Sequence, residues 1–229
     1  MKKVLVTGAT GSLGEAIVKY FASENYFVYI HYYHNKAKAL SLLEEIHDQG
    51  EIVTFSMQDT VNIKEVLQNI HVDVLINNAG ITRDNLFFWM GDEEWEEVID
   101  TNVNGLFRVT KALLPQFITS KKGSIVNISS ISGMVGNIGQ ANYAASKGAI
   151  IAFTKSLSLE LARYKICVNC VAPGLVDSEM TKDLDANLKK SIPLRRYGTT
   201  DEIAHAVYFA ATNTYMTGEV LNISGGMVR

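Results

Sequence analysis

The sequence predicts an α/β fold: a doubly wound parallel sheet of seven strands, flanked by helices, in a single domain over residues 1–229. Short apolar runs alternate with longer amphipathic segments along the whole chain. The runs are apolar on both faces, which is typical of parallel strands covered by helices on both sides. Right-handed crossover connections between such parallel strands produce a doubly wound sheet. Ligands bind to such a sheet beyond the C-terminal ends of its strands.

Seven runs are the expected strands, and helices are expected between most of them. The strand segments are KVLVTG, YFVYIHYY, IVTFSM, VDVLINNAG, GSIVNISS, KICVNCVAPG and GEVLNISGG. A first helix is expected over about residues 12–24, and a second, KAKALSLLEEIHDQG, is expected to end with Gly50 as its C-cap. Asp59 is the expected N-cap of the next helix. With three prolines and no linker or repeat, one domain is the simplest organisation.

Composition and charge exclude several classes of protein. Hydrophobic residues make up 47% and charged residues 20% of the chain, as in a soluble globular protein, and a net charge of −3 gives no sign of nucleic-acid binding. The N-terminus MKKVLVTG lacks the apolar core of a secretory signal, and no run approaches the roughly 18 apolar residues of a membrane span. We therefore expect a cytoplasmic protein without a membrane partner.

Cysteine and histidine spacing predicts no metal site. Cys167 and Cys170 have a C-x-x-C spacing, but they lie in a β-branched run, where positions i and i+3 face opposite ways. The sequence has no second cysteine pair to complete a zinc site. The histidines at positions 31, 34, 47, 71 and 205 show no ligand spacing and are expected to be structural or exposed.

A glycine-rich loop joins the first strand to the first helix. The segment VLVTGATGSLGEAI places Gly8, Gly11 and Gly14 between the strand and an amphipathic helix. Glycine allows tight turns and close approach to a phosphate, and a helix N-terminus favours negative charge. A glycine pattern alone indicates no more than a tight turn, but in this position it predicts dinucleotide binding in a Rossmann-like fold.

The end of the second strand bears on which dinucleotide is bound. NAD enzymes usually carry an acidic residue there for the ribose 2′-hydroxyl, whereas YIHYYHNKAKA has no acidic residue before Glu44. His34, Asn35 and Lys36 stand there instead and could hold a 2′-phosphate. This predicts NADPH, and the alternative interpretation is a solvated helix start.

A tyrosine and a lysine lie four residues apart in NYAASKGAI. On a helix, Tyr143 and Lys147 would share one face. One interpretation is surface packing. The other is a proton-transfer site, because a nearby ammonium favours the phenolate and lowers a tyrosine pKa from about 10 toward the working pH.

Five motifs occur in order along nearly the whole chain: TGATGSLG, NNAG, NISS, YAASK and VAPG. In this combination the chain resembles the short-chain dehydrogenase/reductase family. Within that family, NNAGITRDNL, VIDTNVNGLFRVTKALLP, GNIGQANYAASK and TGEVLNISGGM look most like bacterial 3-oxoacyl-[acyl-carrier-protein] reductases. The loop departs from the common T-G-x-x-x-G-x-G pattern, since Ser12 replaces its middle glycine and Gly11 adds a glycine one position earlier.

The resemblance implies a catalytic tetrad, formed by Asn102, Ser130, Tyr143 and Lys147. In the family the serine hydrogen-bonds the carbonyl oxygen, the tyrosine is the acid/base, and the asparagine holds a water that relays protons to the lysine. Ser129 and Ser132 compete with the serine by position, and Asn104 competes with the asparagine. The implied cofactor contacts are Gly8, Thr10, Gly11, Ser12, Leu13, Gly14, His34, Asn35, Lys36, Met57, Asn78, Ala79, Gly80, Tyr143, Lys147, Pro173, Gly174 and Val176.

The resemblance also implies the substrate and the partners. The substrate is a 3-oxoacyl thioester on acyl-carrier protein or CoA, reduced with NADPH in fatty-acid, polyketide or polyene synthesis. Rival interpretations are a reductase of a small carbonyl or sugar, and a binding protein that senses NADPH without turnover. Relatives are usually homotetramers and use the segment after VAPG as a substrate lid. Lys121, Lys122, Arg163 and Lys165 lie near positions where relatives dock the carrier, but they are equally ordinary solvated residues.

Overall fold

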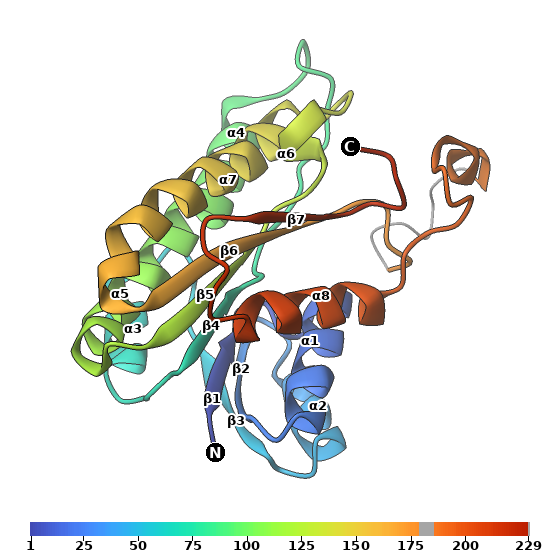
Figure 1. The fold of residues 1–229 in the computed structure, drawn as a ribbon. Helices are drawn as coiled ribbons and strands as arrows, with labels where there is room; N and C mark the ends of the chain where they lie inside the picture. Colours follow the sequence, from blue (N-terminus) through green and yellow to red (C-terminus); the bar gives the residue numbers. More distant parts are fainter. Residues whose placement is uncertain (179–185, 229) are drawn as a thin grey trace.

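The computed structural model describes residues 1–178 and 186–228 and has the predicted α/β architecture (Figure 1). Seven strands form one sheet in the order β3-β2-β1-β4-β5-β6-β7, and every neighbouring pair is parallel. Each strand overlaps one of the seven predicted runs. The strands are β1 (Lys3–Val6), β2 (Phe27–Tyr32), β3 (Gly50–Thr54), β4 (Val74–Asn77), β5 (Gly123–Ile128), β6 (Ile166–Pro173) and β7 (Val220–Ile223).

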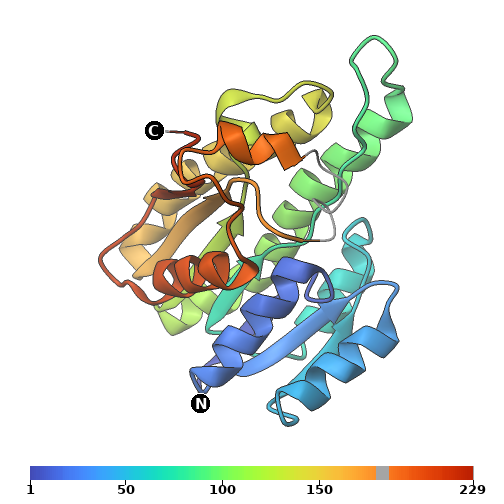
Figure 2. The same cartoon turned by 90° about the vertical axis from the view of Figure 1, so that its right-hand side faces the viewer.

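Helices cover both faces of the sheet (Figures 1 and 2). One face carries α1 (Ser12–Ser23), α2 (Lys36–Glu45) and α8 (Thr200–Thr212). The other carries α3 (Thr60–Leu67), α5 (Gly105–Ser120) and α7 (Ala141–Leu161). The remaining described elements are α4 (Asp92–Ile99), α6 (Ser132–Val135), a π-helical turn (Asp100–Asn104) and 3₁₀ turns (Ala162–Tyr164 and Ala186–Ser191).

The double covering explains why the strands are apolar without alternation. In β1, Val4, Leu5 and Val6 are all fully buried. Val4 and Val6 pack in the core beneath α1, α2 and α8, whereas Leu5 packs in the opposite core with Phe117 of α5. Successive strand side chains point to opposite faces, so one continuous apolar run supplies both cores.

The C-terminal helix α8 packs directly on the N-terminal helix α1. The ring centroid of Tyr208 in α8 lies 5.2 Å from that of Tyr20 and 5.3 Å from that of Phe21. Its hydroxyl donates a hydrogen bond to the carboxylate of Glu24 at 3.0 Å. One layer of the fold is therefore built from the two ends of the described chain.

Two predictions about helix ends are confirmed. The helix expected over residues 12–24 is α1, which runs from Ser12 to Ser23 with Glu24 as its C-cap. Asp59 caps α3, since its carboxylate accepts hydrogen bonds from the backbone N–H groups of Val61 and Asn62, both at 3.0 Å. A capping carboxylate of this kind satisfies donors that the first helical turn leaves unpaired.

Gly50 is not the C-cap of α2, and that prediction was wrong. The helix ends at Glu45, and His47 and Asp48 take the left-handed conformation, with φ of 53° and 55°. Gly50 instead begins β3, where a Cβ atom would come within 2.3 Å of the Val28 carbonyl oxygen. The glycine is therefore needed for the close approach of β3 to β2, because any side chain would collide with that strand.

Cys167 and Cys170, which share the C-x-x-C spacing, are free thiols. Cys170 is buried and Cys167 is partly exposed. Among the described residues, no group of three or more His, Cys, Asp or Glu side chains could hold a metal ion. No helix in the same residues is long and apolar enough to cross a membrane. The segment after VAPG, where a lid is expected, includes residues 179–185, which lie outside the described residues.

Candidate active site

The candidate site lies where the strand order reverses, at the C-terminal ends of β1 and β4. The Thr7 hydroxyl accepts hydrogen bonds from the backbone N–H groups of Asn78 and Ala79, both at 3.0 Å. The side-chain amide of Asn78 donates to the carbonyls of Thr7 at 2.9 Å and Gly8 at 3.1 Å. The NNAG segment is therefore joined to the glycine loop, and the Asn78 side chain is turned toward that loop.

Two of the three predicted loop glycines are required by geometry. Gly8 has a φ of +62°, and a Cβ atom there would lie 2.8 Å from the Cα atom of Ala79. A Cβ atom at Gly14 would lie 2.3 Å from the Gly8 carbonyl oxygen. At Gly11 the nearest contact would be at 3.5 Å, which is ordinary van der Waals distance. The shape of the loop thus depends on Gly8 and Gly14.

The loop leads into the N-terminus of α1, a favourable position for an anion. Gly11 is the N-cap, and as a glycine it has no side chain with which to cap the helix. Thr10, Ser12 and Leu13 lie at the same turn and are partly exposed. Backbone N–H groups and the positive end of the helix dipole favour phosphate there. A tight glycine cradle beside such a helix end fits the pyrophosphate of a dinucleotide.

A buried histidine, to which the sequence assigned no specific partner, supports this loop. His31 of β2 is 2% exposed. Its Nδ1 atom lies 3.0 Å from the Gly8 backbone nitrogen, and its Nε2 atom lies 3.0 Å from the Phe55 carbonyl oxygen. Burial lowers the pKa of His31 to about 4, so the ring is neutral at pH 7. The expectation of a structural or exposed histidine is met, but the contact with the loop could not be predicted from the sequence.

The three residues predicted to select NADPH are exposed at the end of β2, and one of them has a structural role. Asn35 is the N-cap of α2, and its side-chain oxygen accepts a hydrogen bond from the Lys38 N–H at 2.9 Å. The side chains of His34 and Lys36 are exposed. Lys38 itself reaches back to α1, where its Nζ atom lies 3.4 Å from the carboxylate of Glu15. Lys38 is a basic group that the sequence analysis did not single out.

Met57, predicted to lie beside the cofactor, uses its side chain to pack the core. It is 7% exposed and belongs to the core between the sheet and α5. A Cβ atom at Gly105 in α5 would come within 2.8 Å of the Met57 Cβ atom. The Met57 carbonyl accepts a hydrogen bond from Arg108 at 3.1 Å. The structure therefore places the Met57 side chain against α5.

Tyr143 and Lys147 share one face of α7, as their spacing predicts. Lys147 is 4% exposed, and its Nζ atom lies 5.5 Å from the centroid of the half-buried Tyr143 ring. The same ammonium donates a hydrogen bond to the Ile128 carbonyl at the end of β5, at 2.8 Å. Ser130 follows two residues later, and hydrogen bonding by its side chain acts to lower the pKa of the Tyr143 phenol. Three members of the predicted tetrad thus meet at one edge of the sheet.

The expected lowering of the Tyr143 pKa by Lys147 does not occur. Burial raises the pKa of Tyr143 to about 12, an effect that the hydrogen bond from Ser130 opposes and the charge of Asp84 reinforces. Burial likewise lowers the pKa of Lys147 to about 8. Desolvation disfavours the charged form of each group, and it is the largest cause of both pKa shifts. The phenol therefore keeps its proton at neutral pH, as a proton donor must.

Asn102 joins the site from a π-helical turn between α4 and α5. The residue is fully buried. Its side-chain oxygen accepts from the Ile81 N–H at 2.8 Å, and its amide nitrogen donates to the Ile81 carbonyl at 3.0 Å and to the Ser146 hydroxyl at 3.1 Å. A Cβ atom at Gly80 would lie 3.3 Å from the Asn102 side-chain oxygen and 3.4 Å from Lys147 Nζ. Gly80 therefore lies against both side chains, and the widened turn is of the kind found at functional sites.

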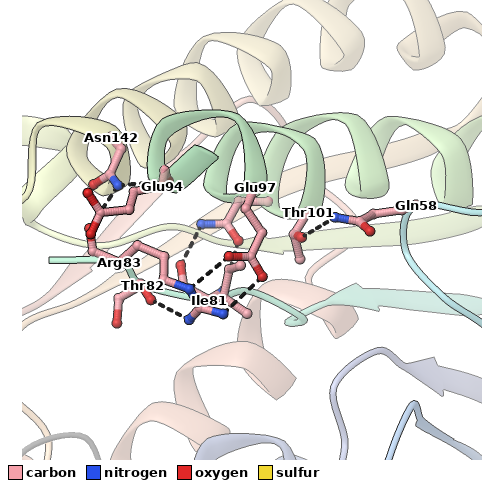
Figure 3. Close-up of polar contacts among 9 residues, drawn as sticks. Gln58, Ile81, Thr82, Arg83, Glu94, Glu97, Thr101 and Asn142 are labelled. Carbon is pink, nitrogen blue, oxygen red and sulfur yellow. Dashed lines mark hydrogen bonds and ion pairs between the residues drawn. The ribbon is translucent and has the colours of Figure 1, made fainter. Parts of the chain in front are cut away.

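Asn142, directly before Tyr143, ties α7 to the segment that follows β4 (Figure 3). It is fully buried. Its amide nitrogen donates to the carbonyls of Arg83 at 2.9 Å and Glu94 at 3.1 Å, and its oxygen accepts the Tyr143 N–H at 2.7 Å. Arg83 in turn pairs with Glu97 of α4 at 2.8 Å. Sequence reasoning missed this residue, which fixes the backbone around Tyr143.

The end of β6 brings the last predicted residues to the same edge of the sheet. The Pro173 carbonyl accepts a hydrogen bond from the Ile131 N–H at 3.0 Å, next to Ser130. A Cβ atom at Gly174 would lie 2.8 Å from the Cα atom of the residue that follows β7. Val176 forms an isolated bridge just beyond the strand. These residues lie at the C-terminal ends of β6 and β7, on the side of the tetrad.

The basic residues considered for carrier docking lie at the N-terminal ends of the strands, opposite the end that carries the tetrad. Lys121 and Lys122 precede β5, and Arg163 and Lys165 precede β6. Because all strands are parallel, these positions are at the N-terminal ends, away from the tetrad of the same chain. Within one chain these residues are therefore not close to the tetrad, and carrier docking and ordinary solvated residues both stay open as interpretations. Lys122 is also paired with Asp73 at 3.7 Å.

The fold and this arrangement of side chains are those of a short chain dehydrogenase. The model of the family described as short chain dehydrogenase matches residues 2–189, and the chain belongs to this family. It is similar to the 3-oxoacyl-[acyl-carrier-protein] reductase FabG of Staphylococcus epidermidis, with 42% identity over 99% of this chain and 98% of the relative. Reductases of the same name from Staphylococcus aureus and Chlamydia muridarum are 43% and 42% identical over 99% of this chain, and the matches cover 98% and 97% of those relatives.

Proposed function

We propose that the protein is an NADPH-dependent ketoreductase that converts a 3-oxoacyl thioester on acyl-carrier protein to the 3-hydroxyacyl thioester, in fatty-acid or related synthesis. The observation that carries the proposal is the meeting of Ser130, Tyr143 and Lys147 beside the glycine loop. The substrate class follows from the names of relatives that match nearly the whole chain.

The four side chains of the tetrad can supply the proton and the charge stabilisation that carbonyl reduction requires. The Ser130 hydroxyl donates a hydrogen bond to the carbonyl oxygen and stabilises the negative charge that develops there. The Tyr143 phenol donates its proton to that oxygen. Lys147 stabilises the phenolate that remains, and Asn102 holds the water through which the proton is replaced. The hydride for the carbonyl carbon is what a bound nicotinamide supplies.

The choice of NADPH over NADH is supported by charge at the end of β2. His34 and Lys36 are exposed there, and Lys38 lies one helical turn further on. The first carboxylate after the strand is Glu44, at the far end of α2. A ribose 2′-phosphate would gain from these basic groups, whereas a 2′-hydroxyl would lack its usual acidic partner.

We also infer a single-domain, cytoplasmic homotetramer assembled through α5 and α7. Phe107 of α5 is 52% exposed and Leu159 of α7 is 82% exposed, an apolar exposure that burial against another copy would remove. Light scattering should give a mass of about four chains. A monomer would contradict the assembly but not the activity.

The test is NADPH oxidation with a 3-oxoacyl carrier substrate and with acetoacetyl-CoA, with NADH in parallel. We expect turnover with NADPH, a higher kcat/KM on the carrier substrate, and a loss of about a hundredfold or more in Tyr143→Phe. The variant should still bind NADPH, because the phenol oxygen is removed without changing the fold. Turnover on acetoacetyl-CoA alone would indicate a CoA substrate, and NADPH binding without turnover on either would refute the proposed reaction.

A further inference from the structure

His31 is a buried titratable group in contact with the glycine loop, and the proposed reaction does not use it. It lies near the C-terminal end of β2, with its ring stacked on that of Phe55 at a centroid distance of 4.0 Å. Both ring nitrogens are engaged by backbone: Nδ1 by the N–H of Gly8 and Nε2 by the carbonyl of Phe55, each at 3.0 Å. A residue that only filled space would need neither contact.

The two partners fix the state of the ring. A backbone N–H only donates, so Nδ1 must be unprotonated and accept the hydrogen bond from Gly8. A backbone carbonyl only accepts, so Nε2 must carry the proton and donate it to Phe55. The histidine is therefore the neutral Nε2–H tautomer. The doubly protonated ring would set an N–H of the ring against the N–H of Gly8.

Gly8 is the point at which the loop is held from both sides. Gly8 has a φ of +62°, and a Cβ atom there would collide with Ala79. Its carbonyl accepts hydrogen bonds from the Asn78 amide at 3.1 Å and from the Gly11 N–H at 3.2 Å. On the other side its N–H is held only by His31 among the described residues. Because the contact joins β2 to the turn that follows β1, it sets how that turn presents its backbone to a phosphate.

We propose that His31 is a positioning residue for the dinucleotide, and that it acts through the hydrogen bond from Gly8 to Nδ1 rather than through the packing of its ring. The inference rests on the proposed function, in which the glycine loop binds NADPH. It predicts that cofactor affinity follows the presence of an acceptor at the Nδ1 position and not the stability of the fold.

Two substitutions separate the two contacts. In His31→Asn the side-chain oxygen lies two bonds from Cβ, as Nδ1 does, so it can accept from Gly8 while the donor to Phe55 is lost. In His31→Gln the terminal amide lies three bonds from Cβ, as Nε2 does, so it can donate to Phe55 while the acceptor for Gly8 is lost. Each variant loses one hydrogen bond and the aromatic ring, which makes them matched controls for one another.

The experiment is a fluorescence titration of NADPH with wild type, His31→Asn and His31→Gln, with thermal unfolding of all three. We expect NADPH to bind His31→Asn within about threefold of wild type and His31→Gln about tenfold more weakly. The two variants should unfold at similar temperatures, and kcat at saturating NADPH should be nearly unchanged in both. Equal affinity for the two variants, or affinity that follows unfolding temperature, would overturn the role of the Gly8 contact.

A second measurement needs no cofactor, and the His31 signals are assigned by their absence from His31→Asn. In ¹⁵N-histidine-labelled wild type at pH 7, the His31 resonances should show a protonated Nε2 and an unprotonated Nδ1. The opposite tautomer or a charged ring would overturn the inference even if His31→Gln failed to fold. A wild type that binds no NADPH would instead refute the proposed function and the role of His31 together, which distinguishes the two failures.

Discussion

Between pH 7 and pH 5, the free energy of unfolding of the wild type should fall more steeply than that of His31→Asn. Burial lowers the pKa of His31 from 6.5 to about 4 in the folded chain. At pH 5 the imidazole of the unfolded chain binds a proton that the folded chain excludes, so acid favours unfolding. The contribution of this group is therefore fully present above pH 6.5 and is lost as the pH falls toward 4.

The size of the effect follows from the same two values. A pKa fall from 6.5 to about 4, at about 1.4 kcal/mol per unit, corresponds to roughly 3 kcal/mol in all. About 2 kcal/mol of it should be lost between pH 7 and pH 5. The asparagine variant has no group that titrates in this range at position 31, so the difference between the two proteins isolates the histidine from every other titrating group.

Urea unfolding at pH 7, 6 and 5 measures the effect, at one fixed protomer concentration because assembly stabilises the folded state. The stability difference between wild type and His31→Asn should shrink by about 2 kcal/mol from pH 7 to pH 5. His34→Asn, which removes an exposed imidazole from the end of β2, is the matched control and should keep the wild-type pH dependence. Parallel curves for wild type and His31→Asn would refute the reasoning, because the ring would then be protonated without cost in the folded chain.

Three further predictions concern the loop, a helix cap and the support of the tyrosine. Gly14→Ala, whose new Cβ atom would lie 2.3 Å from the Gly8 carbonyl oxygen, should lower the free energy of unfolding by at least about 2 kcal/mol, whereas Gly11→Ala, with its nearest contact at 3.5 Å, should change it by less than about 0.5 kcal/mol in urea unfolding. Asp59→Ala removes the cap of α3 and should cost about 1 kcal/mol, with no change in kcat; a larger loss would mean that the carboxylate has a role beyond capping. Asn142→Ala leaves two backbone carbonyls without their donor and should lower kcat about tenfold or more while NADPH affinity stays within about threefold, and an unchanged kcat would show that the tyrosine is positioned without it.

The strands could be predicted because their pattern depends only on local sequence. A run such as the one around Leu5 is apolar at every position because helices cover both sides of the sheet, and that condition is visible without knowing which helices they are. The cap at Asp59 is equally local, since its two partners are two and three residues away. The role of Gly50 was predicted wrongly. His47 and Asp48, which are not glycines, take the left-handed conformation after α2, and the contact that requires a glycine at position 50 is with Val28 of β2.

The supporting residues of the candidate site could not be predicted for the same reason. His31 meets Gly8 across 23 residues of sequence, and Asn142 meets Arg83 across 59. A single buried polar side chain has no periodicity, so its role becomes readable only when its partners are placed. The direction of the Tyr143 pKa shift was predicted wrongly. The spacing shows that Lys147 is near but not that both groups are buried, and burial is the largest cause of both pKa shifts.

The packing of α8 on α1 has a consequence for the order in which the chain can mature during synthesis. The face of α1 that carries Tyr20 and Phe21 is complete only when Tyr208 has arrived, and Tyr208 hydrogen-bonds to Glu24 across 184 residues. At translation rates of about 5–20 residues per second, that apolar face waits on the order of ten seconds or more for its neighbour. Helix α1, which follows the glycine loop, is therefore synthesised early but completes its packing only when α8 has been made.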